Sequence, residues 1–362
     1  MSCDDKTEPG TRQSALRIVD ANANRAAEGL RVVEDYCRFV LDDAHLSRIC
    51  KTVRHELTQA LAPLDRELRT SARDTVGDVG IVPLGVQKAD VEASVFSLDQ
   101  IAAANSERVK QALRAIEEYL KLLCADGAAR VEGLRYRWYT LEKALVITSA
   151  SQKRLAGARL YVLIDGGVSE CAFAERVQAL VAGGVHLVQL RDKRQADRTL
   201  LARARLLRRV IDESQTKPLL IINDRPDIAA LCRADGVHVG QDELSVRDVR
   251  QIVGPKMLVG VSTHSIEQAR QAILDGASYL GCGPTFPSET KQFSQFPGLD
   301  FLREVAAEIS LPAFAIGGIT LENLPAVLAA GFSRVAVSGA VATTGNVECE
   351  VTSFLTALKR RT

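Results

Sequence analysis

The chain of 362 residues is poor in aromatic side chains and carries almost no net charge. Aromatic residues make up 5% of it, and 46 Lys and Arg stand against 45 Asp and Glu, for a formal net charge of +1. A broad basic surface for nucleic acid is therefore excluded, because such a surface needs a clear excess of Lys and Arg. Any binding of phosphate must be local.

The sequence also lacks long apolar runs and cysteine pairs of the metal-binding type. No run approaches the roughly 20 apolar residues of a membrane span, and the N-terminus, MSCDDKTEPG, is polar and acidic where a signal peptide is basic and then apolar. We therefore expect a cytoplasmic protein without a membrane partner. The eight cysteines form no C-x-x-C pair or short Cys/His cluster, so we interpret them as small, buried apolar residues.

Residues 11–143 carry apolar side chains at helical spacing and predict a mostly α-helical domain over residues 1–150. An internal repeat with an offset of 83 residues runs through this domain. The residues Asn22, Arg25, Leu30, Arg31, Val33, Glu34, Asp35 and Tyr36 recur as Asn105, Arg108, Leu113, Arg114, Ile116, Glu117, Glu118 and Tyr119. Arg54 and Arg137 keep the same offset. Two related helical pairs are expected, with the glycine-rich loop RDTVGDVGIVPLG between them.

After residue 150, short runs rich in Val, Ile and Leu alternate with amphipathic stretches. The strand candidates are residues 160–164, 186–190, 219–223, 236–239, 258–261, 279–283, 313–316 and 334–337. This number of β/α units predicts a closed (β/α)8 TIM barrel over residues 151–362. A doubly wound open sheet is the alternative, but its first strand usually precedes a G-x-G-x-x-G loop, and the chain has DGGVSE there.

Charged residues follow the predicted strands, where the active sites of such barrels lie. Arg191, Lys193 and Lys291 supply positive charge, and Asp224 and Glu243 supply carboxylates. This mixture is expected for a polyphosphate with Mg²⁺, because the ion takes one or two carboxylates and completes its shell with phosphate oxygens. The alternative for any single one of these residues is an ion pair at a solvated rim.

The last two predicted strands end in the pairs Gly317-Gly318 and Ser338-Gly339. Many barrels of this class bind a monophosphate at this place through backbone N–H groups. Glycine lets the backbone approach the anion closely. A monophosphate region beside a diphosphate region indicates a reaction of two substrates.

Seven motifs at these strand ends resemble those of the thiamine phosphate synthase family in order and spacing, over about residues 155–360. They are VQLRDK (188–193), IINDR (221–225), DGVHVGQDE (235–243), LVGVSTH (258–264), GCGPTFPSETK (281–291), AIGGIT (315–320) and VAVSGA (335–340). The resemblance implies a transferase that condenses hydroxymethylpyrimidine diphosphate with hydroxyethylthiazole phosphate, giving thiamine phosphate and pyrophosphate. It also implies Mg²⁺ as the cofactor.

The resemblance further implies roles for individual residues. Gln189, Arg191, Lys193 and Asn223 would contact the pyrimidine diphosphate, Asp224 and Glu243 would hold Mg²⁺, Ser262 and Lys291 would touch the departing pyrophosphate, and Ser288, Thr290, Gly318, Val337 and Ser338 would seat the thiazole phosphate. Pyrophosphate would leave first, and Arg191, Lys291 and Ser262 would act catalytically at the leaving group. No general base is assigned, and we interpret His238 as a packed barrel residue.

Two positions depart from the family's pattern. Aspartate is usual where this chain has Glu243, which follows Asp242, so the choice of metal ligand between the two stays open. Ser288 stands where threonine is common. The alternatives for the barrel are a thiazole tautomerase-like protein, which shares a histidine in the strand 5 loop, here His264, and a non-catalytic phosphate sensor. The retained cations and carboxylates favour the synthase.

The repeated N-x-x-R and L-R-x-[VI]-E-[DE]-Y segments resemble a small domain fused to this synthase in some bacteria and associated with hydroxymethylpyrimidine phosphate kinase activity. No Walker motif G-x-x-x-x-G-K-[ST] accompanies them. The alternative is a structural or dimerisation module, with Arg31/Glu34 and Arg114/Glu117 as surface ion pairs. The expected partners are the small-molecule substrates, and the oligomeric state, a homo-oligomer included, stays open.

Overall fold

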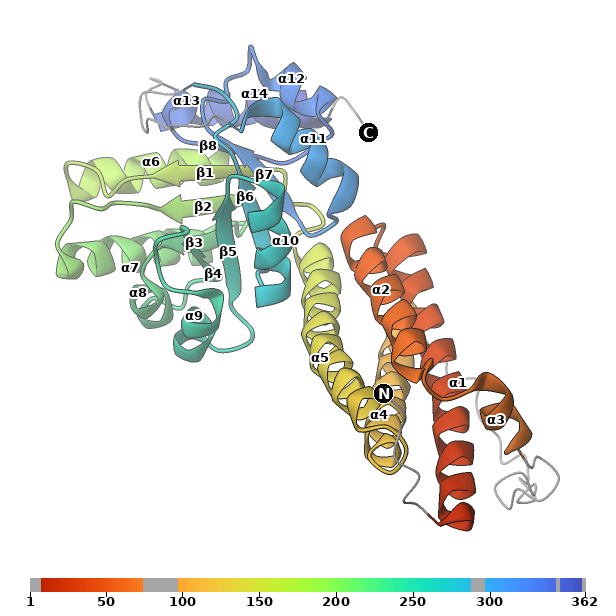
Figure 1. Cartoon of the computed structure of the whole chain (residues 1–362). Coiled ribbons are helices and arrows are strands. Elements are labelled where there is room, and N and C mark those ends of the chain that lie inside the picture. Colours follow the sequence, from red (N-terminus) through yellow and green to blue (C-terminus); the bar gives the residue numbers. More distant parts are fainter. Residues whose placement is uncertain (1–7, 74–96, 288–296, 343–345, 360–362) are drawn as a thin grey trace, which may run out of the picture. The chain divides into compact units, whose positions relative to one another are not determined.

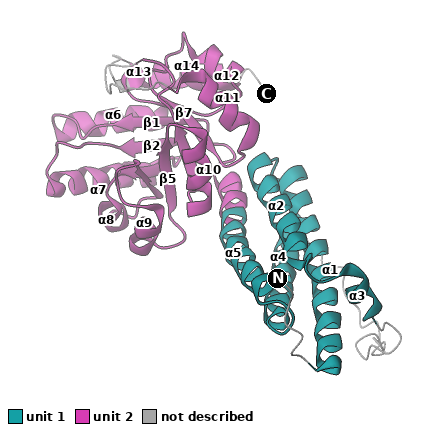
Figure 2. Cartoon of the chain, in the orientation of Figure 1, with its two compact units in different colours: residues 1–145 teal, residues 146–362 magenta. Residues whose placement is uncertain are grey.

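The computed structural model describes residues 8–73, 97–287, 297–342 and 346–359. The chain forms two compact units, residues 1–145 and 146–362, of which the first is helical and the second a barrel (Figure 1; Figure 2). The division falls inside the helix α5 (Ala125–Arg154), which contributes residues to both units. A functional boundary at residue 150 stays a prediction.

The described residues of the helical unit form two helix pairs and one short helix. Its elements are α1 (Pro9–Phe39), α2 (Ala44–Leu61), α3 (Arg66–Ser71), α4 (Leu98–Leu120) and the first part of α5. The Asp43 carboxylate caps α2 by accepting a hydrogen bond from the backbone of Leu46, and Ser97 and Gln100 form a capping box at the start of α4. The described helices thus include α1 followed by α2 and α4 followed by α5, and the relation between the two pairs stays a prediction.

The repeat relates α1 to α4 by 83 residues, but it relates α2 to α5 by a different offset. Glu34 pairs with Arg54 of α2 at 3.1 Å, and its counterpart Glu117 pairs with Arg135 of α5 at 2.6 Å. Arg135, not Arg137, is thus the structural counterpart of Arg54, and the match at constant offset is wrong for this pair. The reason is that α4 ends two residues before the position that matches the end of α1.

The two glutamates of the repeat also correct the expectation of surface ion pairs. Arg31 lies 3.9 Å from Glu34 and Arg114 lies 3.0 Å from Glu117, so both predicted pairs exist. The glutamate side chains are only 12% and 5% exposed, however. Glu117 is buried and Glu34 is largely buried, and each joins two helices.

The second unit is a closed barrel of eight parallel strands in sequential order. The strands are β1 (Leu160–Ile164), β2 (Leu187–Leu190), β3 (Leu219–Asn223), β4 (Gly236–Val239), β5 (Leu258–Thr263), β6 (Tyr279–Cys282), β7 (Ala313–Ile316) and β8 (Val335–Val337). Each predicted strand is found within two residues of its expected bounds. Because β1 pairs with β8, the open doubly wound sheet is excluded.

The helices of this unit follow the strands in the α/β order that the sequence predicts. They are α6 (Glu170–Ala182), α7 (Asp197–Glu213), α8 (Pro226–Leu231), α9 (Val246–Val253), α10 (Ile266–Asp275), α11 (Gly298–Glu308), α12 (Leu324–Ala329), α13 (Gly339–Ala342) and α14 (Val347–Lys359). A buried core cluster takes alternate residues of the strands, among them Tyr161, Ile221 and Phe314. This alternation is expected for positions that face the barrel interior.

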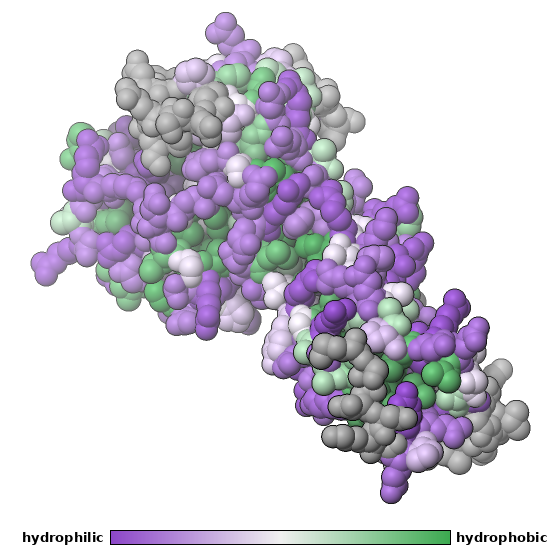
Figure 3. Space-filling view, in the orientation of Figure 1, coloured by the Kyte–Doolittle hydropathy of each residue, from purple (hydrophilic) through white to green (hydrophobic). Residues whose placement is uncertain are grey.

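Most of the described cysteines are buried, as predicted. Cys37, Cys50, Cys124, Cys232 and Cys282 are buried, whereas Cys171 and Cys349 are exposed, which the sequence interpretation had wrong. Hydrophilic side chains dominate the visible face of each unit (Figure 3). Over the described residues, no helix combines the length and the apolar character that crossing a membrane requires.

Candidate active site

The carboxyl ends of the barrel strands carry most of the polar residues that the sequence singles out. Gln189 lies in β2, Asn223 ends β3 and Ser262 lies in β5. Arg191 and Lys193 directly follow β2. Because the eight strands are parallel and closed, these ends share one rim of the barrel.

A lysine and two carboxylates meet at this rim. Lys193 Nζ lies 2.9 Å from Asp224 Oδ2 and 3.2 Å from Glu243 Oε1, and Asn223 Nδ2 donates to the same Asp224 oxygen at 2.6 Å. The hydrogen bond to Asp224 raises the pKa of Lys193, and Glu243 adds to the effect. Glu243 rather than Asp242 is the carboxylate that shares this lysine. One point between the two carboxylates thus accepts a cation.

The backbone at Asp224 has an uncommon conformation. Its φ of 58° lies in the left-handed region, and its N–H donates to the carbonyl oxygen of His238 on the neighbouring strand at 2.8 Å. Such backbone is more often found at functional sites than elsewhere. The next residue, Arg225, forms ion pairs with Asp197 and Asp227 instead.

Gln189 and Ser262 lie beside the buried polar groups of Tyr161 and His238, to which the sequence assigned no contact with a ligand. Ser262 Oγ is 2.9 Å from His238 Nε2, and the Gln189 amide donates to the Tyr161 hydroxyl. Burial lowers the pKa of His238 to about 4. The negative charge of Asp224 opposes this shift, and the positive charge of Arg191 adds to it. His238 is buried in the barrel as predicted, but it is also hydrogen-bonded to a predicted substrate contact.

Gly317 and Gly318 after β7 have φ values of 100° and 64°, a region that favours glycine. A Cβ atom on Gly318 would lie 2.8 Å from the carbonyl oxygen of Pro287 and 2.9 Å from that of Phe286. The glycine pair is therefore required for the packing of the β6 loop. This packing is a structural reason for the pair, in addition to the predicted phosphate contact.

The predicted site residues at the end of β8 pack and bond within the barrel. Ser338 Oγ donates to the carbonyl oxygen of Leu163 at 3.2 Å, and Val337 is 3% exposed. The helix α13 begins at the next residue, Gly339. A phosphate contact at Val337 and Ser338 would therefore use backbone groups, as the sequence predicts for this place.

Comparison with known proteins identifies the family. A family model described as thiamine monophosphate synthase matches residues 160–341, and a model of the ThiD2 family matches residues 17–144. The thiamine-phosphate synthase of Rhodopirellula baltica is 47% identical over 339 residues, which cover 91% of this chain and 89% of the relative. The chain belongs to the thiamine monophosphate synthase family. Its activity is that of a thiamine-phosphate synthase, a transferase of thiamine biosynthesis.

Two further relatives of this thiamine monophosphate synthase family extend the comparison. The thiamine-phosphate synthase of Gloeobacter violaceus is 41% identical over 329 residues, covering 91% of this chain and 92% of the relative. Among solved structures, the thiamine phosphate pyrophosphorylase from Pyrococcus furiosus is 29% identical, with a TM-score of 0.49 over 55% of this chain and 95% of that one. The tautomerase-like and sensor alternatives are set aside, because the full-length relatives are synthases.

Three of the residues predicted from the thiamine phosphate synthase resemblance, Ser288, Thr290 and Lys291, lie outside the described residues. His264, which the tautomerase alternative would use, places its Nδ1 against the carbonyl oxygen of Gly283. Within the described part of the chain, no group of three or more His, Cys, Asp and Glu side chains is arranged to hold a metal ion.

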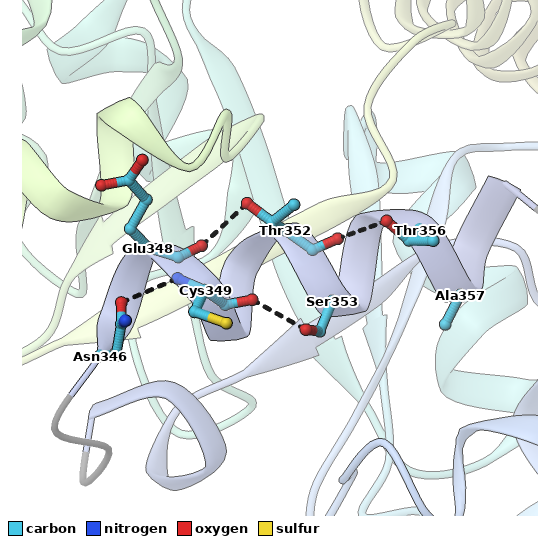
Figure 4. Close-up of a pocket in the computed structure, with 7 residues that line it drawn as sticks. All are labelled: Asn346, Glu348, Cys349, Thr352, Ser353, Thr356 and Ala357. Atoms are coloured by element: carbon cyan, nitrogen blue, oxygen red, sulfur yellow. Dashed lines mark hydrogen bonds between the residues drawn. The ribbon is translucent and has the colours of Figure 1, made fainter.

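A groove of about 620 Å³ lies along α14 (Figure 4). Its hydroxyl groups bond to the helix itself: Thr352 Oγ1 donates to the carbonyl oxygen of Glu348, and Ser353 Oγ to that of Cys349, each at 2.9 Å. These hydroxyl groups are therefore engaged by the backbone of α14. None of the predicted site residues lines the groove.

Proposed function

We propose that the barrel condenses hydroxymethylpyrimidine diphosphate with hydroxyethylthiazole phosphate at its strand ends, releasing pyrophosphate. The arrangement of Lys193 between Asp224 and Glu243 carries the proposal, because it joins a phosphate-binding cation to two carboxylates. Arg191 is the first residue after β2, the strand that contains Gln189. This rim therefore offers cations for a diphosphate and oxygens for a hard metal ion.

The two carboxylates fit Mg²⁺. The Lys193 ammonium group is a stand-in cation within 3.2 Å of both, and Mg²⁺ needs only one or two carboxylates when phosphate oxygens and water complete its shell. When bound, Mg²⁺ would neutralise charge on the diphosphate. Asn223 holds Asp224 Oδ2 in place, and Lys193 is then available to the diphosphate oxygens.

The role of the chain's own residues is to stabilise charge and to orient the substrates. We infer a dissociative displacement, in which pyrophosphate leaves before the thiazole nitrogen attacks. Arg191 and Lys193 would stabilise the leaving group, together with Lys291 and Ser262 as predicted from the resemblance. Gly318, Val337 and Ser338, with Ser288 and Thr290, would hold the thiazole phosphate in position. No residue is needed as a general base.

Turnover by the full chain tests this proposal. Pyrophosphate release and thiamine phosphate formation are measured with both substrates and Mg²⁺, and again after chelation by EDTA. We expect product only with the metal, restored when Mg²⁺ is added back. Product formation that EDTA leaves unchanged would contradict the metal assignment, and substrate binding without pyrophosphate release would contradict the reaction.

For the helical unit we propose hydroxymethylpyrimidine phosphate kinase activity, supported by the match to the ThiD2 family and by one break in the repeat. Asp20 is a buried carboxylate, 7% exposed, that pairs with Arg73, and the matching position of the second half is Ala103. The repeated Asn22 and Asn105 instead donate to carbonyl oxygens of their own helices, so they are explained by the fold.

The full chain carrying Asp224→Asn tests the kinase activity with the barrel reaction impaired. Incubated with ATP and the pyrimidine monophosphate, it is expected to accumulate the diphosphate. The additional change Asp20→Asn is expected to abolish this accumulation. If the Asp224→Asn chain forms no diphosphate, the helical unit is a structural module.

A further inference from the structure

A chain of hydrogen bonds runs through the barrel interior between two predicted substrate contacts. Gln189 of β2 donates to the hydroxyl of Tyr161 in β1, whose oxygen lies 3.0 Å from the hydroxyl of Tyr279 in β6. The Tyr279 hydroxyl lies 3.2 Å from His238 Nδ1 in β4, and His238 Nε2 lies 2.9 Å from Ser262 Oγ in β5. Five strands thus contribute one side chain each.

The middle of this chain is closed to solvent and closely packed. Tyr161, Tyr279 and His238 are 2%, 0% and 7% exposed. Gly260 of β5 leaves the room for them, since a Cβ atom there would lie 2.1 Å from Tyr279 Cζ and 2.5 Å from His238 Nδ1. In such surroundings each donor needs a partner within the protein, because an unpaired buried polar group costs free energy.

The donors can be assigned by following the chain from Gln189. Its amide N–H bonds to the Tyr161 oxygen, so the Tyr161 O–H is left for Tyr279. The Tyr279 O–H then donates to His238 Nδ1. A neutral imidazole has one N–H, so the His238 proton lies on Nε2 and is donated to Ser262 Oγ.

Both ends of the chain then have a fixed polarity. Gln189 Oε1 is a buried acceptor with no hydrogen-bond partner among the described residues, and the hydroxyl hydrogen of Ser262 is not used by His238. We propose that Tyr161, Tyr279 and His238 are positioning residues that present Gln189 as an acceptor and Ser262 as a donor to the pyrimidine diphosphate. This proposal rests on the function proposed for the barrel.

The chemistry of the ligand follows from this polarity. The group that faces Gln189 must donate a hydrogen bond, as an N–H group on a heterocycle does, and the group that faces Ser262 must accept one, as a diphosphate oxygen does. Turning the Gln189 amide round would reverse every bond down to Ser262, since each intermediate group has one proton to give. The two ends therefore change together, although they lie on different strands.

Substitution of the tyrosines tests the coupling in the full chain. Tyr161→Phe frees the Gln189 amide, and we expect the KM for the pyrimidine diphosphate to rise about ten- to hundred-fold, with a smaller change in kcat. The KM for the thiazole phosphate should stay the same. Combining Tyr161→Phe with Tyr279→Phe should cost little more than the worse single change, because both break one chain. Effects that multiply would overturn the proposal.

Phe314→Leu is the matched control for packing. The Phe314 ring lies edge-on to both tyrosines, with centroids at 5.3 Å from Tyr161 and 5.7 Å from Tyr279, but it forms no hydrogen bond. The substitution Phe314→Leu should lower the stability of the barrel and leave the KM for the pyrimidine diphosphate near that of the unchanged protein. An equal rise in this KM for Phe314→Leu would show that packing alone explains the effect.

Nitrogen-15 NMR of the histidines reads the polarity without turnover. The chain has five histidines, and the spectrum of His238→Gln identifies the signals of His238. In the substrate-free protein we expect the His238 proton on Nε2 and none on Nδ1. In Tyr279→Phe we expect a mixture of the two tautomers. A proton on Nδ1 would overturn the proposal even if turnover is normal. If the spectrum shows the proton on Nε2 but the protein makes no thiamine phosphate, the hydrogen bonds are as proposed and the proposed function is rejected.

Discussion

In the helical unit the repeated polar side chains bond within the unit, whereas in the barrel polar side chains from several strands meet at one rim. Asn22 and Asn105 bond to the helix that carries each, and Glu34 and Glu117 join the helices of one pair. Lys193, by contrast, is shared by carboxylates from two different loops. Repetition of a polar residue is therefore evidence for the fold, and convergence on one point is evidence for a ligand.

Asp224→Asn should give the largest effect, because it removes charge from the point where the barrel residues converge. We expect kcat/KM for thiamine phosphate formation to fall roughly a thousand-fold, with little loss of stability. The matched control is Asp197→Asn, which changes a carboxylate on the rim that pairs with Arg225. If both changes lower kcat/KM equally, the distinction between a rim ion pair and the convergent site fails.

The ion pairs of the repeat should matter for stability alone. Glu117→Ala leaves Arg135, whose side chain is 9% exposed, without its buried partner, and should cost about 3–5 kcal/mol in the free energy of unfolding of the helical unit. Glu34→Ala should cost less, because Arg54 is 33% exposed and regains water. Chemical unfolding followed by circular dichroism measures both. Thiamine phosphate formation by the barrel should be unchanged, and its loss would contradict the comparison.

Most of the fold could be predicted from the sequence, because buried parallel strands appear as short apolar runs and the polar residues at their ends mark the rim. The chain from Tyr161 to His238 could not be predicted. Periodicity shows that Tyr161 and Tyr279 face inward, but not that strands β1 and β6, far apart in sequence, bring their hydroxyls to 3.0 Å. The pairing of Arg135 was missed for a similar reason, since a shift of two residues in helix length leaves no mark in composition.

The buried polar chain of the barrel should make its stability depend on pH. The pKa of His238 is lowered by burial to about 4, from 6.5 in the unfolded chain, so the unfolded state binds more protons between these values. Stability is then full above pH 6.5 and falls as the pH drops, by about 2 kcal/mol at pH 5.

Guanidinium unfolding at pH 7 and pH 5, compared with His238→Gln, measures this contribution. The variant should be less stable at pH 7 and should lose about 2 kcal/mol less than the unchanged protein on acidification. The burial of His186 also lowers its pKa, and its contribution has the same sign, but it remains in both proteins and cancels in the comparison. An equal loss in the two proteins would mean that His238 is not kept neutral by the fold.

The smallest expected effect is a gain in the stability of the helical unit, at an exposed position outside the repeat contacts. Gly133 lies exposed within α5, and a Cβ atom there would meet no other atom within 4 Å. Gly133→Ala should therefore raise the free energy of unfolding by about 0.5–1 kcal/mol, because alanine loses less backbone entropy in a helix. Gly29→Ala is the matched control with the opposite sign, since its Cβ would lie 2.8 Å from Val109 Cγ2 where α1 packs on α4. If both changes stabilise, α1 and α4 are less closely packed than the repeat contacts require.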